Sequence, residues 1–517
     1  MTQPARLDLL ETDAPAILGG PAPDPDAPEP SCFRDLNLDQ VVAAIVAGRD
    51  EYDLVPLFRT ALREVADVEH RHEVFRDLER GTLRADVEAF AEAMRETRRF
   101  LHLTRAQHFK QEVERWFLDA AEVYCAAVRT LAAALDAADL RSDGFLGLRG
   151  YLDAYTRSAG FVTLAADRER VREGLDRVRY TVRIKGARVT VGLFADEPDY
   201  SAEVERTFER FRRGAVETRL AMAGDPGSMS HVEAWIAERV ALLHPAAFRA
   251  LDAFCKEHAG FVDAGLARFD REVQFYLAYL DHMDALAGTG AVFSYPMVGG
   301  RGEIFAEDAC DLALAGKLAH TGKRVVRNGF SLRPPERILV VTGPNQGGKT
   351  TFARAFGQLH QLAALGVPVP ARRASLVLPD RVLTHFERQE DISTLRGKLD
   401  DELVRMREIL EHATAGSVLV VNEIFASTTL EDAVQLGTNV LRRVIDLGCA
   451  AVFVTFVDEL TTVGPETVSM VAAVDPRDPA VRTFEIVRRP SDGRAYALAI
   501  AEKYGLSQAS LARRLEP

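Results

Sequence analysis

The feature that most constrains this chain is the stretch GPNQGGKTT at 343–351, which follows the apolar run ILVVT at 338–342. It matches the pattern G-x-x-x-x-G-K-[ST], in which the glycines allow successive backbone N–H groups to point inward at an anion. The residues after the stretch have helical periodicity, so the helix expected from Thr350 would direct its positive end at the same anion. A strand, a glycine-rich loop and a helix in this order predict a phosphate-binding loop for a nucleotide.

The residue types in the loop have separate expected roles. Lys349 would reach the outer phosphates and the Thr350 hydroxyl would bind Mg²⁺, so the pattern implies ATP and Mg²⁺ as ligands. The alternative interpretation is a glycine-rich turn between a strand and a helix that binds nothing. The expected nucleotide-binding residues are Gly343, Pro344, Asn345, Gln346, Gly347, Gly348, Lys349, Thr350 and Thr351.

A second apolar run, SVLVV at 417–421, leads into Asn422 and Glu423. A P-loop ATPase usually has Asp then Glu here, where Asp orients Mg²⁺ through water and Glu polarises the attacking water. We therefore predict Glu423 and Lys349 as catalytic residues and Thr350 and Asn422 as metal ligands. Asn422 offers an oxygen without charge, which predicts weaker Mg²⁺ binding and weak ATPase activity. The alternative is that Asn422 only caps the strand and that hydrolysis has been lost.

The pattern of the chain changes near residue 290. Residues 33–285 mostly carry apolar residues at helical spacing, with one alternating segment, YTVRIKGARVTVGLF at 180–194, that predicts a β-hairpin. Beyond residue 290, short β-rich runs alternate with helical stretches, which is typical of a parallel sheet. The predicted fold is a long α-helical region with a β-hairpin, followed by an α/β P-loop ATPase domain with a mainly parallel sheet.

Composition limits the domain organisation and the classes of protein that remain possible for this chain. Residues 1–31 are rich in Pro, Ala and Asp and are predicted to be a disordered tail, followed by a helical region at 32–290 and an ATPase domain at 291–517. The net charge of −13 argues against a protein that coats nucleic acid, although it permits a local basic groove. The sequence has no apolar run of about 18 residues and no signal-peptide pattern, and its scattered cysteines indicate no zinc or disulfide framework. A cytoplasmic protein without membrane contact is expected.

Several longer stretches resemble the MutS DNA mismatch-repair family. ILVVTGPNQGGKTTFARAFGQLHQLAALGVPVPARRASLVLPDRVLTHF at 338–386 resembles its ATPase domain, and EDISTL at 390–395 resembles its Gly-x-Ser-Thr-Phe segment. NEIFASTTLEDA at 422–433 is similar to its Asp-Glu-Ile-Gly-Arg-Gly-Thr-Ser-Thr stretch, and DGRAYALAIAEKYGLSQASLARRL at 492–515 is similar to its closing strand–helix segment. The resemblance is weaker over 33–285, where it implies the family's lever and clamp.

The chain departs from the family pattern at three places. Asn422 replaces the family's Asp, and Phe456 stands where the family has a His, although a phenyl ring cannot hydrogen-bond a γ-phosphate. Only the low-complexity residues 1–31 precede the expected lever, where the family has its mismatch-reading module. The expected protein is therefore MutS-like but lacks the N-terminal mismatch-recognition domain.

The resemblance also implies a homodimer through the ATPase domains. In the family a Ser/Thr-rich segment of one subunit completes the phosphate site of the other, and here that segment is Ser427, Thr428 and Thr429. Hydroxyl groups at a helix N-terminus suit a γ-phosphate. The alternative interpretation is local: one of these residues caps the helix that follows. The two interpretations are compatible.

DNA contact is expected at the hairpin. The segment 167–188 carries eight basic and four acidic residues, and Arg183, Lys185 and Arg188 lie about the turn, where they could contact phosphates without reading sequence. A second basic stretch, ERTFERFRRG, follows at 205–214. The alternative is a solvated face of alternating charge.

Two functions from different classes remain. The first is an ATP-switched dimeric clamp on duplex or branched DNA with slow ATP hydrolysis. The second is a nucleotide-binding interaction protein that hydrolyses little or no ATP and binds a protein partner, an interpretation favoured by Asn422, Phe456 and the acidic balance. A small-molecule kinase would need an acceptor pocket near the γ-phosphate, and nothing in the sequence identifies one.

Overall fold

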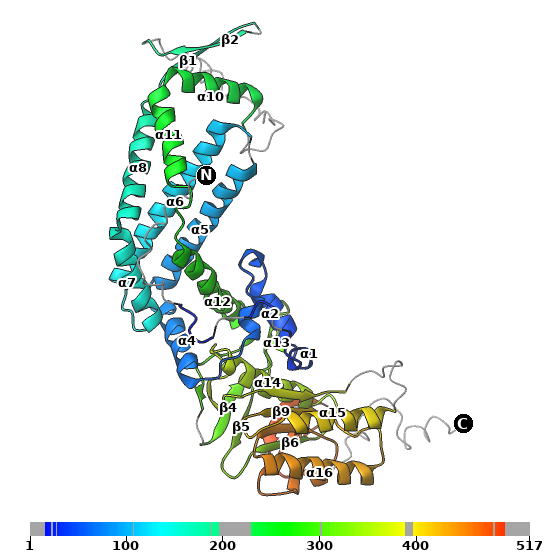
Figure 1. Cartoon of the computed structure of the whole chain (residues 1–517). Helices are drawn as coiled ribbons and strands as arrows, with labels where there is room; N and C mark the ends of the chain where they lie inside the picture. Colours follow the sequence, from blue (N-terminus) through cyan, green and yellow to red (C-terminus); the bar gives the residue numbers. More distant parts are fainter. Residues whose placement is uncertain are drawn as a thin grey trace, which may run out of the picture. The chain divides into compact units, whose positions relative to one another are not determined.

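The computed structural model describes residues 16–21, 24–26, 28–106, 108–186, 188–195, 229–299, 302–387, 397–478 and 481–491 (Figure 1). These residues divide into two compact units. Within the described ranges, unit 1 takes residues 78–140 and 145–270, and unit 2 takes residues 16–77, 141–144 and 271–491. None of the described helices is long and apolar enough to span a bilayer.

Unit 1 is built mainly from helices. Its longest pair, α5 and α6, lie side by side (Figure 1). The buried residues Leu118, Ala121, Cys125 and Val128 of α6 recur at three- and four-residue spacing, so one face of that helix is apolar and packs inward. The helices lying wholly or mostly in this unit are α5 (Leu83–Ala106), α6 (Lys110–Ala137), α7 (Asp143–Arg157), α8 (Ala159–Asp176), α10 (His231–Leu243) and α11 (Pro245–Glu257).

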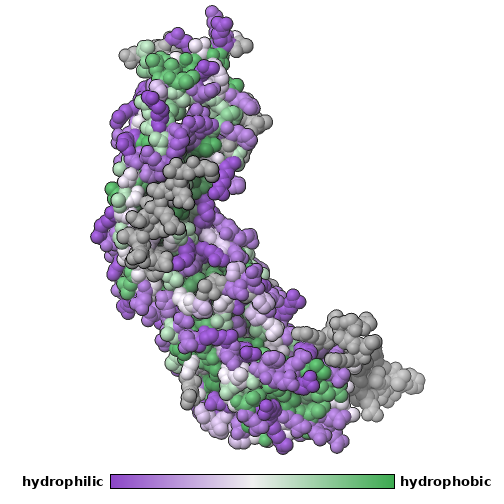
Figure 2. All heavy atoms as spheres, in the orientation of Figure 1, coloured by the Kyte–Doolittle hydropathy of each residue, from purple (hydrophilic) through white to green (hydrophobic). Residues whose placement is uncertain are grey.

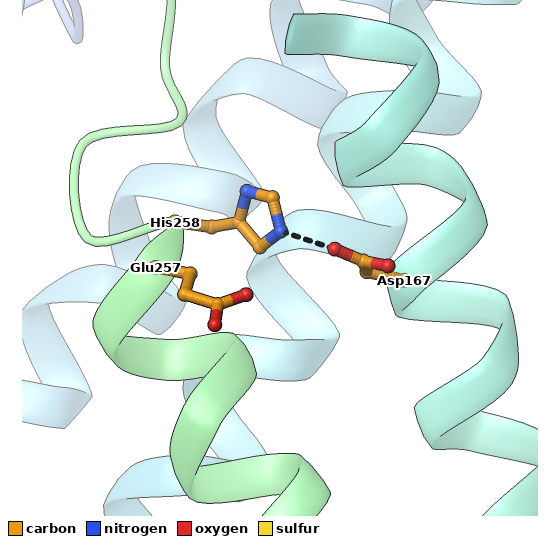
Figure 3. A group of neighbouring side chains, drawn as sticks. All are labelled: Asp167, Glu257 and His258. Atoms are coloured by element: carbon orange, nitrogen blue, oxygen red, sulfur yellow. Dashed lines mark hydrogen bonds and ion pairs between the residues drawn. The ribbon is translucent and has the colours of Figure 1, made fainter.

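A polar contact joins α8 to the C-terminal end of α11 (Figure 3). His258 caps α11, and its Nε2 donates to Oδ2 of Asp167 at 3.0 Å, while Arg170 forms an ion pair with the same carboxylate. Burial lowers the pKa of His258, which favours the neutral imidazole. Glu257 completes a group whose nitrogen and oxygen atoms lie within 4.8 Å of one another. The hydrogen bond therefore joins the two helices, while the ion pair lies within α8 and holds the Asp167 carboxylate.

The predicted hairpin is confirmed, with β1 at Tyr180–Lys185, β2 at Arg188–Leu193 and Gly186 in the turn at a φ of +60°. The register sorts its side chains by chemistry, because residues on a strand alternate between two faces. One face carries the apolar pairs Tyr180–Leu193, Val182–Val191 and Ile184–Val189. The other face carries Arg183, Lys185 and Arg188, all exposed. The three predicted DNA-contacting residues therefore share one face.

Hydrophobic surface gathers where the hairpin and α10 lie (Figure 2). Ile184 is 73% exposed on β1 and Leu242 is 66% exposed on α10. This end of unit 1 is thus apolar as well as basic, and the two kinds of surface occupy opposite faces of the hairpin.

The centre of unit 2 is a six-stranded sheet, in which five strands are parallel and the edge strand β12 pairs antiparallel with β11. The mainly parallel sheet predicted from the sequence is therefore confirmed. Every residue of β6, β9 and β10 is buried, which explains their continuous apolar runs. In spatial order the strands are β12 (Arg482–Arg488), β11 (Thr467–Val474), β6 (Ile338–Thr342), β10 (Ala450–Val454), β9 (Val418–Asn422) and β8 (Val382–His385).

Helices cover both faces of this sheet. On one face, Val340 and Leu419 share a core with Leu441 of α16 (Leu430–Leu447) and Met406 of α15 (Lys398–His412). On the other face α14 (Lys349–Ala364) approaches β9 so closely that a Cβ on Gly357 would lie 3.0 Å from Cγ2 of Val420. The helix after the loop is therefore packed directly on the sheet.

A smaller four-stranded sheet and the remaining helices complete the described part of unit 2. The smaller sheet has the order β3 (Met297–Val298), β7 (Arg373–Leu376), β4 (Ile304–Ala309) and β5 (Asn328–Leu332). The helices are α1 (Cys32–Asp35), α2 (Leu38–Val46), η1 (Asp50–Tyr52), α3 (Val55–Arg59), α4 (Val65–Leu78), α12 (Ala264–Leu286, which begins in unit 1), η2 (Ala287–Thr289), α13 (Leu312–Ala319) and η3 (Asp458–Thr462).

The predicted disordered tail at 1–31 is wrong for its described part. Ile17 and Leu18 are 1% and 5% exposed, and their carbonyl oxygens accept hydrogen bonds from Tyr276 Oη at 2.8 Å and Arg71 Nε at 2.9 Å. Burial of these two apolar residues and the hydrogen bonds to their backbone anchor this part of the Pro- and Asp-rich stretch. Residues 1–15 lie outside the described residues.

The expected division at residue 290 also differs from the structure. Residues 16–77, which the sequence assigns to the tail and the helical region, belong with residues 271–491 to unit 2. Helical periodicity reports that a segment is a helix, but it does not report which sheet or helix the segment packs against. The stretches at 205–214, 390–395 and 492–515 lie outside the described residues.

Candidate nucleotide-binding site

The loop after β6 has a backbone that requires glycine. Gly343 has a φ of +111°, and a Cβ there would lie 3.0 Å from the backbone nitrogen of Ala472. A Cβ on Gly347 would lie 2.9 Å from the carbonyl oxygen of Pro344. A Cβ contact under 3.0 Å is essentially never observed, so Gly347 excludes a side chain unless the loop moves. At Gly343 the contact is tighter than most Cβ contacts, and the positive φ adds backbone strain for any other residue. The glycines predicted from the motif therefore have a steric reason in the fold.

Lys349 begins α14 and points back into the loop. Its Nζ donates to the carbonyl oxygen of Gly343 at 2.8 Å and to Oδ1 of Asn345 at 3.2 Å. The side chain is buried, and burial lowers the pKa of Lys349 while the charge of Glu423 opposes that change. A partly desolvated ammonium group on an inward-facing loop is suited to an anionic ligand, because its charge is poorly screened by water.

Thr350 and Asn422 are brought together as the sequence predicts for a metal pair. Thr350 Oγ1 donates to Oδ1 of Asn422 at 2.9 Å, which joins the first turn of α14 to the end of β9. A hydroxyl and an amide oxygen are ligands of the kind that Mg²⁺ accepts. The pair supplies oxygen atoms without negative charge, so it fits Mg²⁺ with less electrostatic attraction than an Asp would give.

Glu423 follows β9 on an unusual turn. Its backbone N–H donates to the carbonyl oxygen of Val454 at 2.9 Å, and its φ is +55°. Phe425, two residues later, has a φ of +59°, a conformation that residues other than glycine rarely adopt. The carboxyl ends of neighbouring parallel strands share one edge of a sheet, so Glu423 lies at the same edge as the loop after β6.

Within the described chain, the Ser/Thr-rich segment at 427–429 caps the helix that follows it. Thr429 is the N-cap of α16, and its Oγ1 accepts from the backbone N–H of Asp432 at 3.2 Å. Thr428 Oγ1 donates to the side chain of Asp432 at 3.2 Å, and Ser427 is exposed. These contacts provide a hydrogen-bond partner for a backbone N–H group at the start of α16, and Ser427 and Thr429 remain on the surface. Phe456, after β10, is 48% exposed.

The structure adds two residues that no local motif signals. Arg482 of β12 donates from Nε to the carbonyl oxygen of Asn345 at 3.3 Å, and Glu402 of α15 accepts at Oε2 from the backbone N–H of Phe425 at 2.8 Å. Arg482 is distant in sequence from the loop that it contacts. Glu402 is separated from the turn at 423–425 by the rest of α15 and by β9. Only the fold brings them to the site.

Comparison with known proteins agrees with this geometry. The family model for MutS domain V matches residues 339–514. The endonuclease MutS2 of Thermus thermophilus is 34% identical over 197 residues, which cover 36% of this chain and 25% of that protein. The DNA mismatch repair protein MutS of Zymomonas mobilis is 31% identical over 204 residues, covering 38% of this chain and 23% of that protein.

One longer match extends beyond the region matched by the family model. The DNA mismatch repair protein MutS of Azorhizobium caulinodans is 29% identical over 324 residues, which cover 59% of this chain and 32% of that protein. The chain thus spans between about a quarter and a third of these relatives. The region matched by the family model contains the loop, the Asn422–Glu423 strand end and the strand β10 between β6 and β9. Residues 339–514 of this chain are thus similar to domain V of the MutS family.

Proposed function

We propose that unit 2 binds ATP with Mg²⁺ and hydrolyses it slowly, and that nucleotide binding controls attachment of a dimer of this chain to duplex or branched DNA. The observation that carries the proposal is the convergence of Lys349, Thr350 and Asn422 at one edge of the sheet, with Thr350 and Asn422 2.9 Å apart. The names of the relatives, DNA mismatch repair proteins and an endonuclease, support a DNA-directed role.

In this proposal each side chain at the site has a separate role in ATP hydrolysis. Lys349 would stabilise negative charge on the outer phosphates, and Glu423 would polarise the attacking water. Thr350 and Asn422 would hold Mg²⁺, which supplies positive charge near the phosphate oxygens. Asn422 and Phe456 support slow turnover, since one lacks a charge toward the metal and the other lacks a hydrogen-bonding group toward the γ-phosphate.

The Asn422→Asp variant tests the account of slow turnover. A carboxylate at this position should bind Mg²⁺ about tenfold more tightly, which corresponds to about 1.4 kcal/mol, and turnover should increase. The measurement is the ATPase rate as a function of Mg²⁺ concentration. A rate and a Mg²⁺ midpoint equal to those of the unmodified protein would contradict the assigned role of Asn422.

Dimerisation is proposed through the ATPase surfaces, with Ser427, Thr428 and Thr429 of one protomer facing the nucleotide of the other. The cap formed by Thr429 supports this geometry, because it orders the N-terminus of α16 and leaves Ser427 on the surface. ATP would then be bound between two protomers, and its hydrolysis would weaken their contact. In this proposal the helices and hairpin of unit 1 act as the lever and clamp, and a cytoplasmic location is part of the same expectation.

The hairpin supports contact with phosphates. Arg183, Lys185 and Arg188 are exposed on a common face, so three cations can follow one DNA backbone. Replacing all three by alanine should weaken duplex binding and reduce the slope of log K against log salt by about 2 to 3, since each phosphate contact contributes about 0.9. DNA should stimulate ATP turnover in the unmodified protein, and the triple variant should lose that stimulation.

The control for this experiment changes the same charge elsewhere in unit 1. Arg95, Arg99 and Arg157 are exposed residues that pair with neighbouring carboxylates on their own helices. Their combined replacement by alanine should leave the salt slope near that of the unmodified protein. An equal loss of DNA binding in both triple variants would show that net charge, and not the hairpin, controls binding.

A second function is supported by Phe456 and by the neutral Asn422. In this alternative, nucleotide binding switches the conformation of the chain, hydrolysis is absent, and unit 1 holds another protein. The exposed apolar face of the hairpin, which includes Ile184, is compatible with such a partner. ATP-induced dimerisation without affinity for duplex or branched DNA would favour this alternative over the DNA clamp.

A further inference from the structure

A buried carboxylate on α15 reaches the turn that carries Glu423. Glu402 is 6% exposed, and its Oε2 accepts from the backbone N–H of Phe425 at 2.8 Å. Burial raises the pKa of Glu402, and the hydrogen bond from Phe425 acts in the opposite direction. A buried carboxylate is costly to maintain unless a donor meets it, so the contact with Phe425 is the reason that this side chain can be accommodated inside unit 2.

The turn that Glu402 contacts has an unfavourable backbone conformation, so neighbouring groups must stabilise it. Glu423 and Phe425 have φ values of +55° and +59°, a region that residues other than glycine rarely adopt. Such backbone persists only where the surroundings determine it. Two hydrogen bonds do this here: Glu423 N–H donates to Val454 at the end of β10, and Phe425 N–H donates to Glu402 on α15.

Packing of the Phe425 ring gives a second, less directional constraint on the turn. The ring is 1% exposed, but it lines an apolar groove of about 360 Å³ between α15 and α16, together with Met406 and Val440. A side chain beside open volume can move without losing every contact, whereas the N–H bond to a buried carboxylate fixes both distance and direction. The hydrogen bond is therefore the more specific restraint on this end of the turn.

We propose that Glu402 is a positioning residue for Glu423: it holds the Phe425 amide and thereby sets where the Glu423 carboxylate lies relative to the nucleotide. The inference rests on the proposed ATP hydrolysis and deepens it. It also implies that the position of α15 affects hydrolysis, because a displacement of this helix would move the Glu402 acceptor and with it the turn. Glu402 itself touches neither nucleotide nor water in this assignment.

The experiment compares Glu402→Ala with Glu402→Gln. Alanine removes the acceptor, so backbone hydrogen exchange in a peptide covering residues 422–429 should become at least about tenfold faster. The ATPase kcat should fall about 10- to 100-fold while the Kd for ATP changes less than about twofold, because a displaced catalytic group affects the reaction more than binding. Glutamine retains an oxygen at the same reach, so its exchange and kcat should stay within about threefold of the unmodified protein.

Two further variants separate positioning from stability. Glu408→Ala removes an exposed glutamate from the same helix and should change neither exchange nor kcat. Glu402→Asp keeps the charge but shortens the reach to Phe425, so it should behave like the alanine variant. If Glu402→Ala fails to fold, the contrast between the Asp and Gln variants decides the question.

The outcomes distinguish this inference from the proposed function. Absence of ATP turnover in the unmodified protein would contradict hydrolysis, while hydrogen exchange would still report whether Glu402 holds the turn. Unchanged exchange and kcat in Glu402→Ala would overturn the inference and leave hydrolysis intact. An equal loss of ATP affinity and kcat would also overturn it, because that pattern indicates general damage to the site.

Discussion

Glu423→Gln is expected to lower ATP turnover at least about 100-fold while ATP binding is retained. Glutamine has the shape of glutamate but cannot accept a proton from the attacking water, and general-base contributions are commonly about 10²- to 10⁴-fold. The backbone of Glu423 is fixed by its bond to Val454, so the substitution should not disturb the turn. Single-turnover phosphate release and equilibrium ATP binding measure the two quantities separately.

A matched control lies a few residues away. Glu431 is exposed in the first turn of α16, and Glu431→Gln removes the same charge without touching the turn of Glu423. It should leave turnover within about twofold of the unmodified protein, as is usual for surface substitutions. Glu423→Gln should also accumulate an ATP-bound dimer that sedimentation can detect. Turnover that survives the change at Glu423 would exclude this residue as the base.

Lys349→Ala should weaken ATP binding about 100-fold or more, which corresponds to about 2.7 kcal/mol. The reason is the position of the ammonium group, which is buried and points into the phosphate loop. Burial leaves it poorly hydrated, which lowers the pKa of Lys349 and would favour contact with an anion. Calorimetry with MgATP gives the affinity directly.

Two comparisons make the Lys349 result interpretable. Lys349→Met keeps a long apolar side chain in the buried space, so an equal loss of affinity would assign the effect to charge and not to packing. Lys317→Ala, at an exposed position on α13, should bind ATP normally. If the unmodified protein takes up no adenine nucleotide in the presence of Mg²⁺, the whole proposal for unit 2 fails.

Local sequence patterns were sufficient to predict the elements that build the site. The runs at 338–342 and 417–421 are apolar at every position because β6 and β9 are buried on both faces, and the glycine spacing of the loop follows from contacts that exclude Cβ atoms. The hairpin at 180–194 was predictable because alternation and a central glycine are local properties. The pairing of Thr350 with Asn422 followed from two motifs whose spacing is typical of P-loop proteins.

Tertiary interactions account for what the sequence could not predict. Glu402 contacts Phe425 through a fold that places α15 beside the end of β9, and a helical pattern does not indicate which of its polar residues is buried. Ile17 and Leu18 are too few to alter the composition of the stretch around them, yet unit 2 buries both. Phe425 in a left-handed conformation is a further case, because its residue type argues against the backbone that the surrounding contacts impose.

The discontinuity of unit 2 has a consequence for how the protein is made. The described chain leaves this unit after residue 77 and, apart from a short return at 141–144, rejoins it only at residue 271. During translation the helices within residues 16–77 therefore cannot pack against the sheet of unit 2 until most of the polypeptide has left the ribosome. The intervening helical unit is far more local in sequence, and folding is faster when contacts are local. We therefore expect unit 1 to fold before unit 2 is complete during synthesis.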